Sequence, residues 1–167
     1  MIPPHPRIAA FVANLPSLVW PAGVSGYALG DTYRGPAAQL EAYQAGTSNA
    51  LYGESAHSVG GPGWAGAAVD VFPIRGGNVS NDPADYQPIV SLAQAHDLES
   101  LGVLYGIDWS HVQVPGWRSY AVVPLPDDGT WVETPRGWVP ADQAPRRAGA
   151  APLLWLLLLG AAVRARA

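Results

Sequence analysis

The chain has 167 residues and a formal charge of −4, with 13 acidic residues against 9 basic ones. This length fits one domain of ordinary size, and without a Lys/Arg-rich stripe nucleic acid is not expected as a partner. Cysteine is absent, which excludes disulfides, thiolate metal sites and a cysteine nucleophile, so any metal must be held by histidine and carboxylate. The 19 glycines, 17 prolines and 49% hydrophobic residues indicate a loop-rich but folded domain.

The N-terminal segment MIPPHPRIAAFVANLP lacks the basic start and long apolar run of a secretory signal, so standard export is not expected from it. Within it, residues 8–15 are expected to form a short helix or strand. Residues 35–46, GPAAQLEAYQAG, predict a short helix, because Pro36 suits the first helical position and Gly46 suits a stop.

The run AAVDVF at 67–72 predicts a buried strand with one charged residue, Asp70, and a buried carboxylate needs a partner. Residues 83–99 predict a helix that begins after the capping residues Asn81 and Asp82, with Pro88 confining its regular part to the second half.

The next segment, GVLYGIDWSHVQV, predicts two short strands around a turn at residues 106–110, and RSYAVVPL and TWVETPRGWVP are expected to add strands. Mixed helices and strands in this order predict an α+β fold: a small, mainly antiparallel sheet flanked by short helices. We expect one such domain over residues 1–143.

Residues 144–167 form a distinct tail. Residues 148–163 carry no charge, and arginines flank them on both sides. A helix of this length is marginal for a membrane span. The two interpretations are a membrane anchor and a helix packed within a larger assembly, such as a virion.

Four histidines are available as metal ligands. His5 lies in a Pro-rich terminus, and His96 lies late in a predicted helix, where solvation or capping is ordinary. His57 and His111 lie in Gly/Trp-rich loops beside strands, each close to an aspartate. A loop histidine alone is more often structural, but here three short segments supply two histidines and two aspartates: SAH at 55–57, GAAVD at 66–70 and DWSH at 108–111.

These segments resemble the zinc peptidase family of D-alanyl-D-alanine carboxypeptidases and L-alanyl-D-glutamate endopeptidases, which includes many phage endolysins. The family pattern is Ser-x-His, then Gly-x-Ala-x-Asp, then Asp or Glu-x-x-His. The resemblance covers roughly residues 25–118. The matching positions are Tyr33, Arg34, Gln39, Ser55, His57, Gly66, Ala68, Asp70, Asp108 and His111.

The resemblance implies one Zn²⁺ held by His57, Asp70 and His111, with Asp108 as general base. It implies hydrolysis of a peptidoglycan stem or cross-bridge. Asp rather than Glu before the last histidine favours the L-Ala-D-Glu bond over D-Ala-D-Ala. For Asp108 and His111 to face one site, the two residues between them must turn, because a straight strand would point them to opposite faces.

Three further residues are candidates for contact with substrate. Arg34 is expected to bind a substrate carboxylate, since a guanidinium fork recognises carboxylates. Ser55 would orient the substrate or cap a turn. Gln113 would line the site or hydrogen-bond a neighbouring group. Trp64, Trp109 and Trp117 are candidates for the walls of a cleft.

One departure from the family pattern is the spacing of His57 and Asp70, which twelve residues separate where the family commonly has six. We interpret the Gly-rich surplus as a surface insertion near the mouth of the site.

A different class of function stays open, a non-catalytic wall-binding or virion structural protein that keeps the fold. A Ser-His-Asp hydrolase is not favoured, because G-x-S-x-G does not occur. The cellular interpretations are a phage-encoded lysis or virion protein and a bacterial membrane-tethered enzyme that faces the cell wall.

Overall fold

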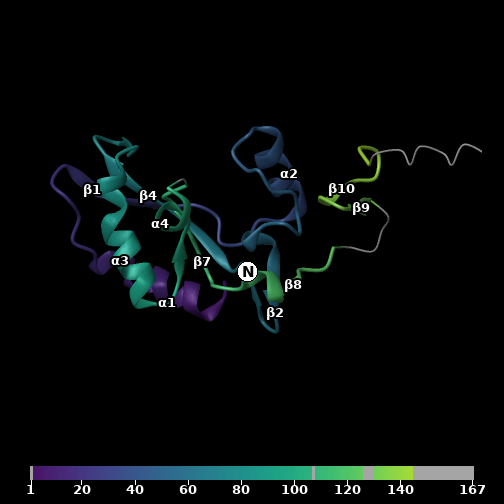
Figure 1. Ribbon diagram of the computed structural model, residues 1–167, viewed down its shortest axis with the longest axis horizontal. Helices are drawn as coiled ribbons and strands as arrows, with labels where there is room; N and C mark the ends of the chain where they lie inside the picture. Colours follow the sequence, from purple (N-terminus) through teal and green to yellow (C-terminus); the bar gives the residue numbers. More distant parts are fainter. Residues whose placement is uncertain (1, 107, 126–129, 145–167) are drawn as a thin grey trace, which may run out of the picture.

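The computed structural model describes residues 2–106, 108–125 and 130–144 and has an α+β fold (Figure 1). Short helices flank small sheets in which every described strand pairing is antiparallel. This confirms the predicted fold class. Across these three ranges no helix is long and apolar enough to span a membrane. Of the predicted tail at 144–167, residues 145–167 lie outside the described residues, so the tail and the domain limit before it stay predictions.

Strand β4 (Ala68–Arg75) is the centre of the main sheet, whose strand order is β1-β4-β7-β6. Its first half pairs with β7 and its second half with β1, so one strand connects the site to the rest of the sheet. The predicted strand at 67–72 is confirmed and continues through Pro73. The other strands of this sheet are β1 (Val24–Leu29), β5 (Asn78–Val79), β6 (Glu99–Ser100) and β7 (His111–Gln113).

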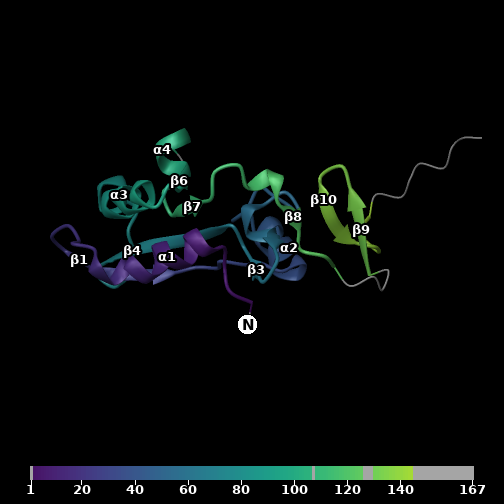
Figure 2. The same cartoon turned by 90° about the horizontal axis from the view of Figure 1, so that it is seen from below.

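Two smaller sheets accompany the main one. The Gly-rich segment between His57 and Asp70 forms a hairpin, β2 (Val59–Gly61) and β3 (Trp64–Ala65), which pairs with β8 (Ala121–Val122). This segment is therefore part of a sheet. The second hairpin, β9 (Trp131–Thr134) and β10 (Gly137–Pro140), lies beside α2 (Pro36–Gln44), at the opposite end of the molecule from α3 (Figure 2).

The core lies between the main sheet and two helices, α1 (Pro6–Asn14) and α3 (Gln87–Ala95), which also contact each other. Ile8 and Phe11 on α1 are fully buried and pack with β4 and β7. Since apolar residues three and four apart share one face of a helix, this pattern buries that face. The helix shares this core with the strands that carry Asp70 and His111.

The predicted helices are confirmed at 36–44 and at 87–95. The second is preceded by the 3-10 helix η3 (Pro83–Tyr86), and Pro88 lies in the first turn of α3, where a proline costs no hydrogen bond. The open alternative at residues 8–15 is resolved as the helix α1. The remaining 3-10 helices are η1 (Leu15–Ser17), η2 (Ala56–Ser58) and η4 (Trp117–Ser119).

One predicted strand is wrong, because residues 101–105 form the short helix α4 (Leu101–Tyr105). The two residues before it already form β6 and pair with β7, so the chain turns away after Ser100. Gly106 ends the helix in the left-handed conformation, with φ of 70°. The residue types at 101–105 favour a strand, but contacts with the rest of the fold override this local preference and the segment is helical.

Candidate metal centre

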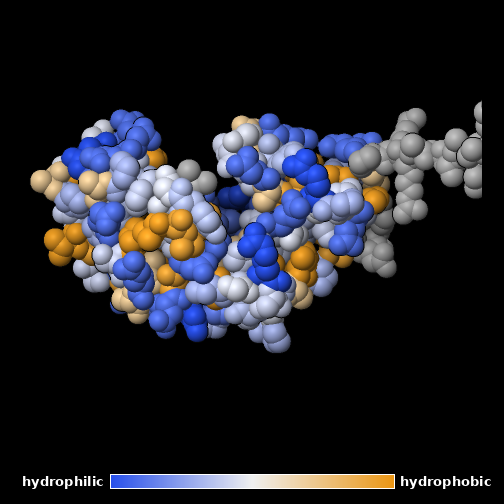
Figure 3. All heavy atoms as spheres, viewed as in Figure 1, coloured by the Kyte–Doolittle hydropathy of each residue, from blue (hydrophilic) through white to orange (hydrophobic). Residues whose placement is uncertain are grey.

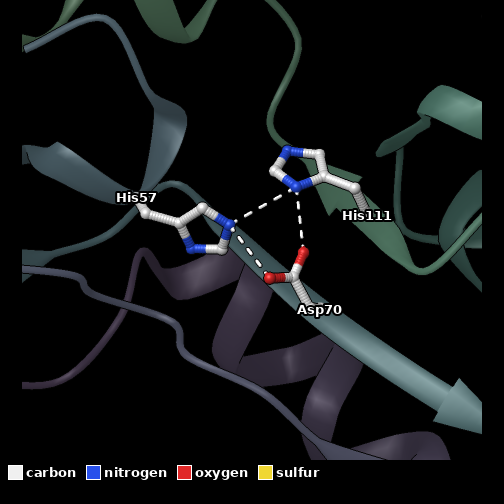
Figure 4. A group of neighbouring side chains, drawn as sticks. All are labelled: His57, Asp70 and His111. Carbon is white, nitrogen blue, oxygen red and sulfur yellow. Dashed lines mark hydrogen bonds and ion pairs between the residues drawn. The ribbon is translucent and has the colours of Figure 1, made fainter. Parts of the chain in front are cut away.

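Three side chains converge from two neighbouring strands and a short 3-10 helix (Figure 4). Asp70 on β4 lies directly opposite His111 on β7 in the antiparallel register, so their side chains are neighbours on one face of the main sheet. His57 comes from η2, immediately before the first strand of the small sheet. The junction of the two sheets is therefore what assembles the group.

The polar atoms of this group are close together. His111 Nδ1 lies 3.0 Å from Asp70 Oδ1, and His57 Nε2 lies 3.5 Å from Asp70 Oδ2. The two ring nitrogens that face each other, His57 Nε2 and His111 Nδ1, are 3.3 Å apart. One ligand atom from each residue lies within 4.8 Å of the others. Both histidines are buried, with 2% and 8% of their surface exposed.

The outer ring nitrogens are each paired with an oxygen that can only accept. His57 Nδ1 lies 3.4 Å from the carbonyl oxygen of Thr32. His111 Nε2 lies 3.2 Å from Gln113 Oε1, and the Gln113 amide in turn donates to Glu99 Oε2 at 3.0 Å. Because Glu99 takes the amide hydrogen, it determines which end of Gln113 faces His111. With a metal ion on the inner side, these two contacts would favour neutral histidines whose hydrogens lie on the outer nitrogens.

In those tautomers two nitrogen lone pairs and a carboxylate would face one another. Such a set of electron-rich atoms is favourable only with a cation among them, either a proton on one ring or a metal ion. Two neutral imidazoles and one carboxylate, with the outer nitrogens hydrogen-bonded to oxygen, are the donor set of a three-ligand metal site. The His57–Asp70–His111 group could thus hold one metal ion.

Asp70 is held as a carboxylate by its neighbours. Burial raises its pKa, but the hydrogen bonds from His111 and His57 and their charges outweigh burial, so the net pKa lies below the ordinary range. Arg34 Nη2 also lies 3.3 Å from Asp70 Oδ2. Asp70 therefore has three neighbours that compensate its charge: His57, His111 and Arg34.

Asp108 lies in the turn that the sequence demanded. Its φ is 51°, and its carbonyl oxygen accepts a hydrogen bond from the His111 backbone N–H at 3.2 Å. Its exposed carboxylate accepts a hydrogen bond from Ser110 Oγ at 2.8 Å. Asp108 and the three converging residues line one cleft. The prediction that residues 109–110 must turn is confirmed.

Gly66 explains one position of the glycine-containing motif. Its φ is 86°, and a Cβ built there would lie 2.0 Å from the carbonyl oxygen of Thr32. That carbonyl is the one that faces His57 Nδ1. Glycine at this position lets the backbone approach closely enough to orient His57.

The three predicted substrate residues all line the cleft and also have partners in the protein. Arg34 contacts the side chains of Asp31, Gln39 and Asp70. Ser55 Oγ accepts the His57 backbone N–H at 3.2 Å, as in the capping alternative. Gln113 bonds His111, as in its second alternative. Contact with substrate stays a prediction for all three.

The cleft has a volume of about 1280 Å³, which is large enough for several residues of a peptide. Leu101 and Tyr105 of α4 line one side, and residues 47–50, which follow α2, line the other. Figure 3 shows the surface hollowed between these two regions, with hydrophilic side chains in the hollow. Of the three candidate tryptophans, Trp117 lines the cleft.

The other histidines have structural roles in this fold. His5 caps the start of α1 and packs against Trp64 and Tyr120, and His96 ends α3 with its ring edge-on to Phe11. Trp64 and Tyr120 also contact each other edge-on, and this contact anchors the β2–β3 hairpin. Of this segment, Val59 lines the cleft and residues 60–66 do not.

Sequence reasoning missed two residues that orient the histidines, Glu99 and Thr32. Glu99 pairs with Gln113 across β6 and β7, and Thr32 acts through its backbone. A carbonyl oxygen carries no sequence signal, and a strand of two residues is too short for its pairing to be predicted.

Comparisons with models of known protein families and with curated proteins found no match. Among solved structures, the chain is similar to the crystal structure of the L-Ala-D-Glu endopeptidase ChiX of Serratia marcescens. The sequence identity is 24% and the TM-score is 0.49, over 66% of this chain and 80% of that chain.

Proposed function

We propose that this chain is a zinc-dependent peptidase that hydrolyses a peptide bond in the stem or cross-bridge of bacterial peptidoglycan. The observation that carries the proposal is the convergence of His57, Asp70 and His111 in a peptide-sized cleft that Asp108 also lines. Three ligands leave a position for water, which is the arrangement of catalytic rather than structural zinc sites.

Zinc is the proposed metal because two imidazoles and one carboxylate suit its mixed nitrogen and oxygen preference. His57 Nε2, His111 Nδ1 and Asp70 would hold it. When bound, zinc activates water and polarises the scissile carbonyl group. Thr32 and Gln113 keep the two imidazoles in the tautomers that this requires.

Asp108 is the proposed general base. Asp108 is exposed and lines the cleft, and Ser110 Oγ donates a hydrogen bond to its Oδ1. It would accept a proton from the attacking water and deliver it to the leaving amine. Arg34 would keep the Asp70 carboxylate in place.

The L-Ala-D-Glu bond is the proposed target in preference to D-Ala-D-Ala. Support for this choice is the Asp-x-x-His pattern at 108–111 and its resemblance to one branch of the zinc peptidases. The proposed partner is therefore a peptidoglycan peptide. Contact of residues 148–163 with a membrane or a virion stays a prediction, as does the choice between a phage and a bacterial setting.

The test measures zinc content and release of new amino termini from isolated peptidoglycan by the full chain. We expect about one zinc per chain and cleavage by the wild type. His111→Ala should lose both. Asp108→Asn should keep zinc and lose about 10²- to 10⁴-fold in rate. Asp142→Asn, an exposed aspartate that does not line this cleft, is the matched control and should behave as the wild type.

Zinc binding without cleavage by the wild type would contradict the peptidase proposal and favour a wall-binding or virion role. Undiminished cleavage by Asp108→Asn would leave the peptidase and remove Asp108 from the chemistry. Mass spectrometry of the released fragments identifies the bond: fragments that begin at D-Glu support the L-Ala-D-Glu choice, and release of free D-Ala with the L-Ala-D-Glu bond intact would contradict it.

A further inference from the structure

We propose that Arg118, rather than Arg34, binds a free carboxylate of the substrate peptide. The inference rests on the proposed function, because the carboxylate is that of a peptidoglycan stem. It arises from the contacts of the two arginines that line the cleft.

Arg34 is already engaged by the protein. Its Nε lies 3.2 Å from Asp31 Oδ2, its Nη1 3.4 Å from Gln39 Oε1 and its Nη2 3.3 Å from Asp70 Oδ2. Every nitrogen of the guanidinium thus has an oxygen partner, and only 14% of the side chain is exposed. A guanidinium has five N–H groups, so a substrate carboxylate at Arg34 would find only two of them free and would lie beside the carboxylates of Asp31 and Asp70, which repel it.

Arg118 has the opposite character. It is exposed, and no carboxylate among the described residues forms an ion pair with it. Its guanidinium carbon lies 4.4 Å from the ring centroid of Trp117, which is itself 6% exposed and therefore held firmly in the core. Stacking on an aromatic face orients the guanidinium and leaves its N–H edges available for a carboxylate.

The position of Arg118 in the fold brings it to the cleft that the metal centre also lines. It lies on η4, in the connection from β7, which carries His111, to β8. Strand β8 pairs with β2 directly after His57, and the Val123 backbone N–H donates to the Ser58 carbonyl. The segment with Arg118 therefore begins after the strand that carries His111 and ends in a strand that pairs next to the 3-10 helix that carries His57.

The chemical class that fits is a peptide carboxylate. A stem that contains L-Ala-D-Glu offers two sources, the α-carboxylate of the D-glutamate and the carboxylate at the C-terminus of the peptide. Either accepts a bidentate pair of hydrogen bonds from a guanidinium, whereas the corresponding carboxamide loses the charge and one acceptor.

The experiment compares three synthetic stem peptides: one with both carboxylates free, one amidated at the D-glutamate and one amidated at the C-terminus. Cleavage kinetics and binding by calorimetry are measured with zinc-loaded full-length protein, the binding in the Asp108→Asn background to prevent turnover. The variants are Arg118→Gln, Arg118→Lys and the control Arg136→Gln, an exposed arginine outside the cleft.

We expect Arg118→Gln to weaken binding of the free peptide about tenfold or more, with the kinetic loss mainly in KM. Its effect should vanish for the peptide whose amidation removes the partner carboxylate, and this identifies the source. Arg118→Lys should recover part of the loss, because it restores charge without the fork. Arg136→Gln should match the wild type.

An equal loss with all three peptides, or no loss with any, would overturn the proposal. If no peptide is cleaved by the wild type, the peptidase function fails by itself. A carboxylate preference in binding that Arg118→Gln removes would then still support Arg118, and absence of binding would reject it.

Discussion

At the scale of single residues, the site depends on which nitrogen of each imidazole carries the hydrogen. Gln113 sets this for His111, and Glu99 sets the orientation of Gln113. The Thr32 carbonyl does the same for His57. None of these three would touch a metal, but each determines whether a lone pair faces it.

Gln113→Ala should weaken metal binding by about 10- to 100-fold, because His111 loses the acceptor that selects its tautomer. Glu99→Ala should have a smaller effect in the same direction. The measurement is the dissociation constant for zinc by competition with a chromophoric chelator. Gln94→Ala, at an exposed position of α3, is the control, and a loss of affinity of equal size there would contradict the argument.

Gly66→Ala should lower the free energy of unfolding by well over about 1 kcal/mol, because it combines a positive φ with a clash against the Thr32 carbonyl. Gly63 separates the two causes, since its φ is 79° and a Cβ there meets nothing within 4 Å. Gly63→Ala should show the smaller cost of φ alone. Equal losses in chemical denaturation would mean that the clash has no effect.

At the scale of elements, the end of β4 is fastened to η3 by a buried carboxylate. Arg75 and Ser80 donate to Asp85, and the Tyr86 hydroxyl donates to the Ser80 carbonyl. The hydrogen bonds from Arg75 and then Ser80 lower the pKa of Asp85 to about 2, against the ordinary 3.8. The strand that carries Asp70 is thus fixed at its far end.

This pKa has a defined consequence for stability. Since the folded carboxylate has the lower pKa, its contribution is fully present above pH 3.8 and is lost as the pH falls towards 2. Asp85→Asn should therefore be clearly less stable than the wild type at pH 5, and the difference should shrink between pH 3.8 and 2. Chemical denaturation of both proteins at several pH values, with a chelator present to keep metal out, measures this difference in the free energy of unfolding. A difference that does not change with pH would contradict the argument.

The packing of α1 gives a prediction of its own. Phe11 is fully buried against the main sheet and α3, so Phe11→Ala should cost about 3 to 5 kcal/mol through lost burial and the cavity left behind. Val12 is only partly buried on the same helix, so Val12→Ala should lower the free energy of unfolding markedly less. The free energy of unfolding measures both, and similar values would show that α1 is not a core element.

At the scale of the whole molecule, a bound metal would add a link between two sheets that already share one hydrophobic core, with Val59 of the small sheet and Val69 of the main sheet in the same cluster. Asp70 and His111 belong to the main sheet, and His57 precedes the small one. A ligand that binds the folded state and not the unfolded state stabilises a protein by about 2.7 kcal/mol when the free ligand concentration is 100 times the dissociation constant. Zinc should therefore raise the melting temperature of the wild type, and a chelator should reverse the shift.

His111→Ala should show no such zinc-dependent shift, because two ligands remain where three are needed. Differential scanning calorimetry with and without zinc measures it. A shift in His111→Ala as large as in the wild type would place the metal elsewhere on the chain.

How much of the site the sequence predicts depends on the kind of interaction. His57, Asp70 and His111 are predictable, because the short motifs around them match a known pattern, although the spacing of His57 and Asp70 departs from it, and the three side chains do converge. The roles of Glu99, Thr32 and Arg118 are not predictable from the sequence. The role of Glu99 follows from the pairing of β6 with β7, and those of Thr32 and Arg118 follow from the partners that they have in the fold. For Arg34 the residue type is consistent with carboxylate binding, but its contacts are internal.

The sequence by itself determined the α+β class, the helices at 36–44 and 87–95, the buried strand around Asp70 and the turn before His111. These follow from local causes: proline and glycine positions, apolar runs and the alternation of side chains along a strand. Only the tertiary structure decided that residues 101–105 are helical and that the Gly-rich segment is a paired hairpin. It also decided that His57 meets the main sheet at its junction with the small one. Such outcomes depend on contacts between distant segments, which local preference does not encode.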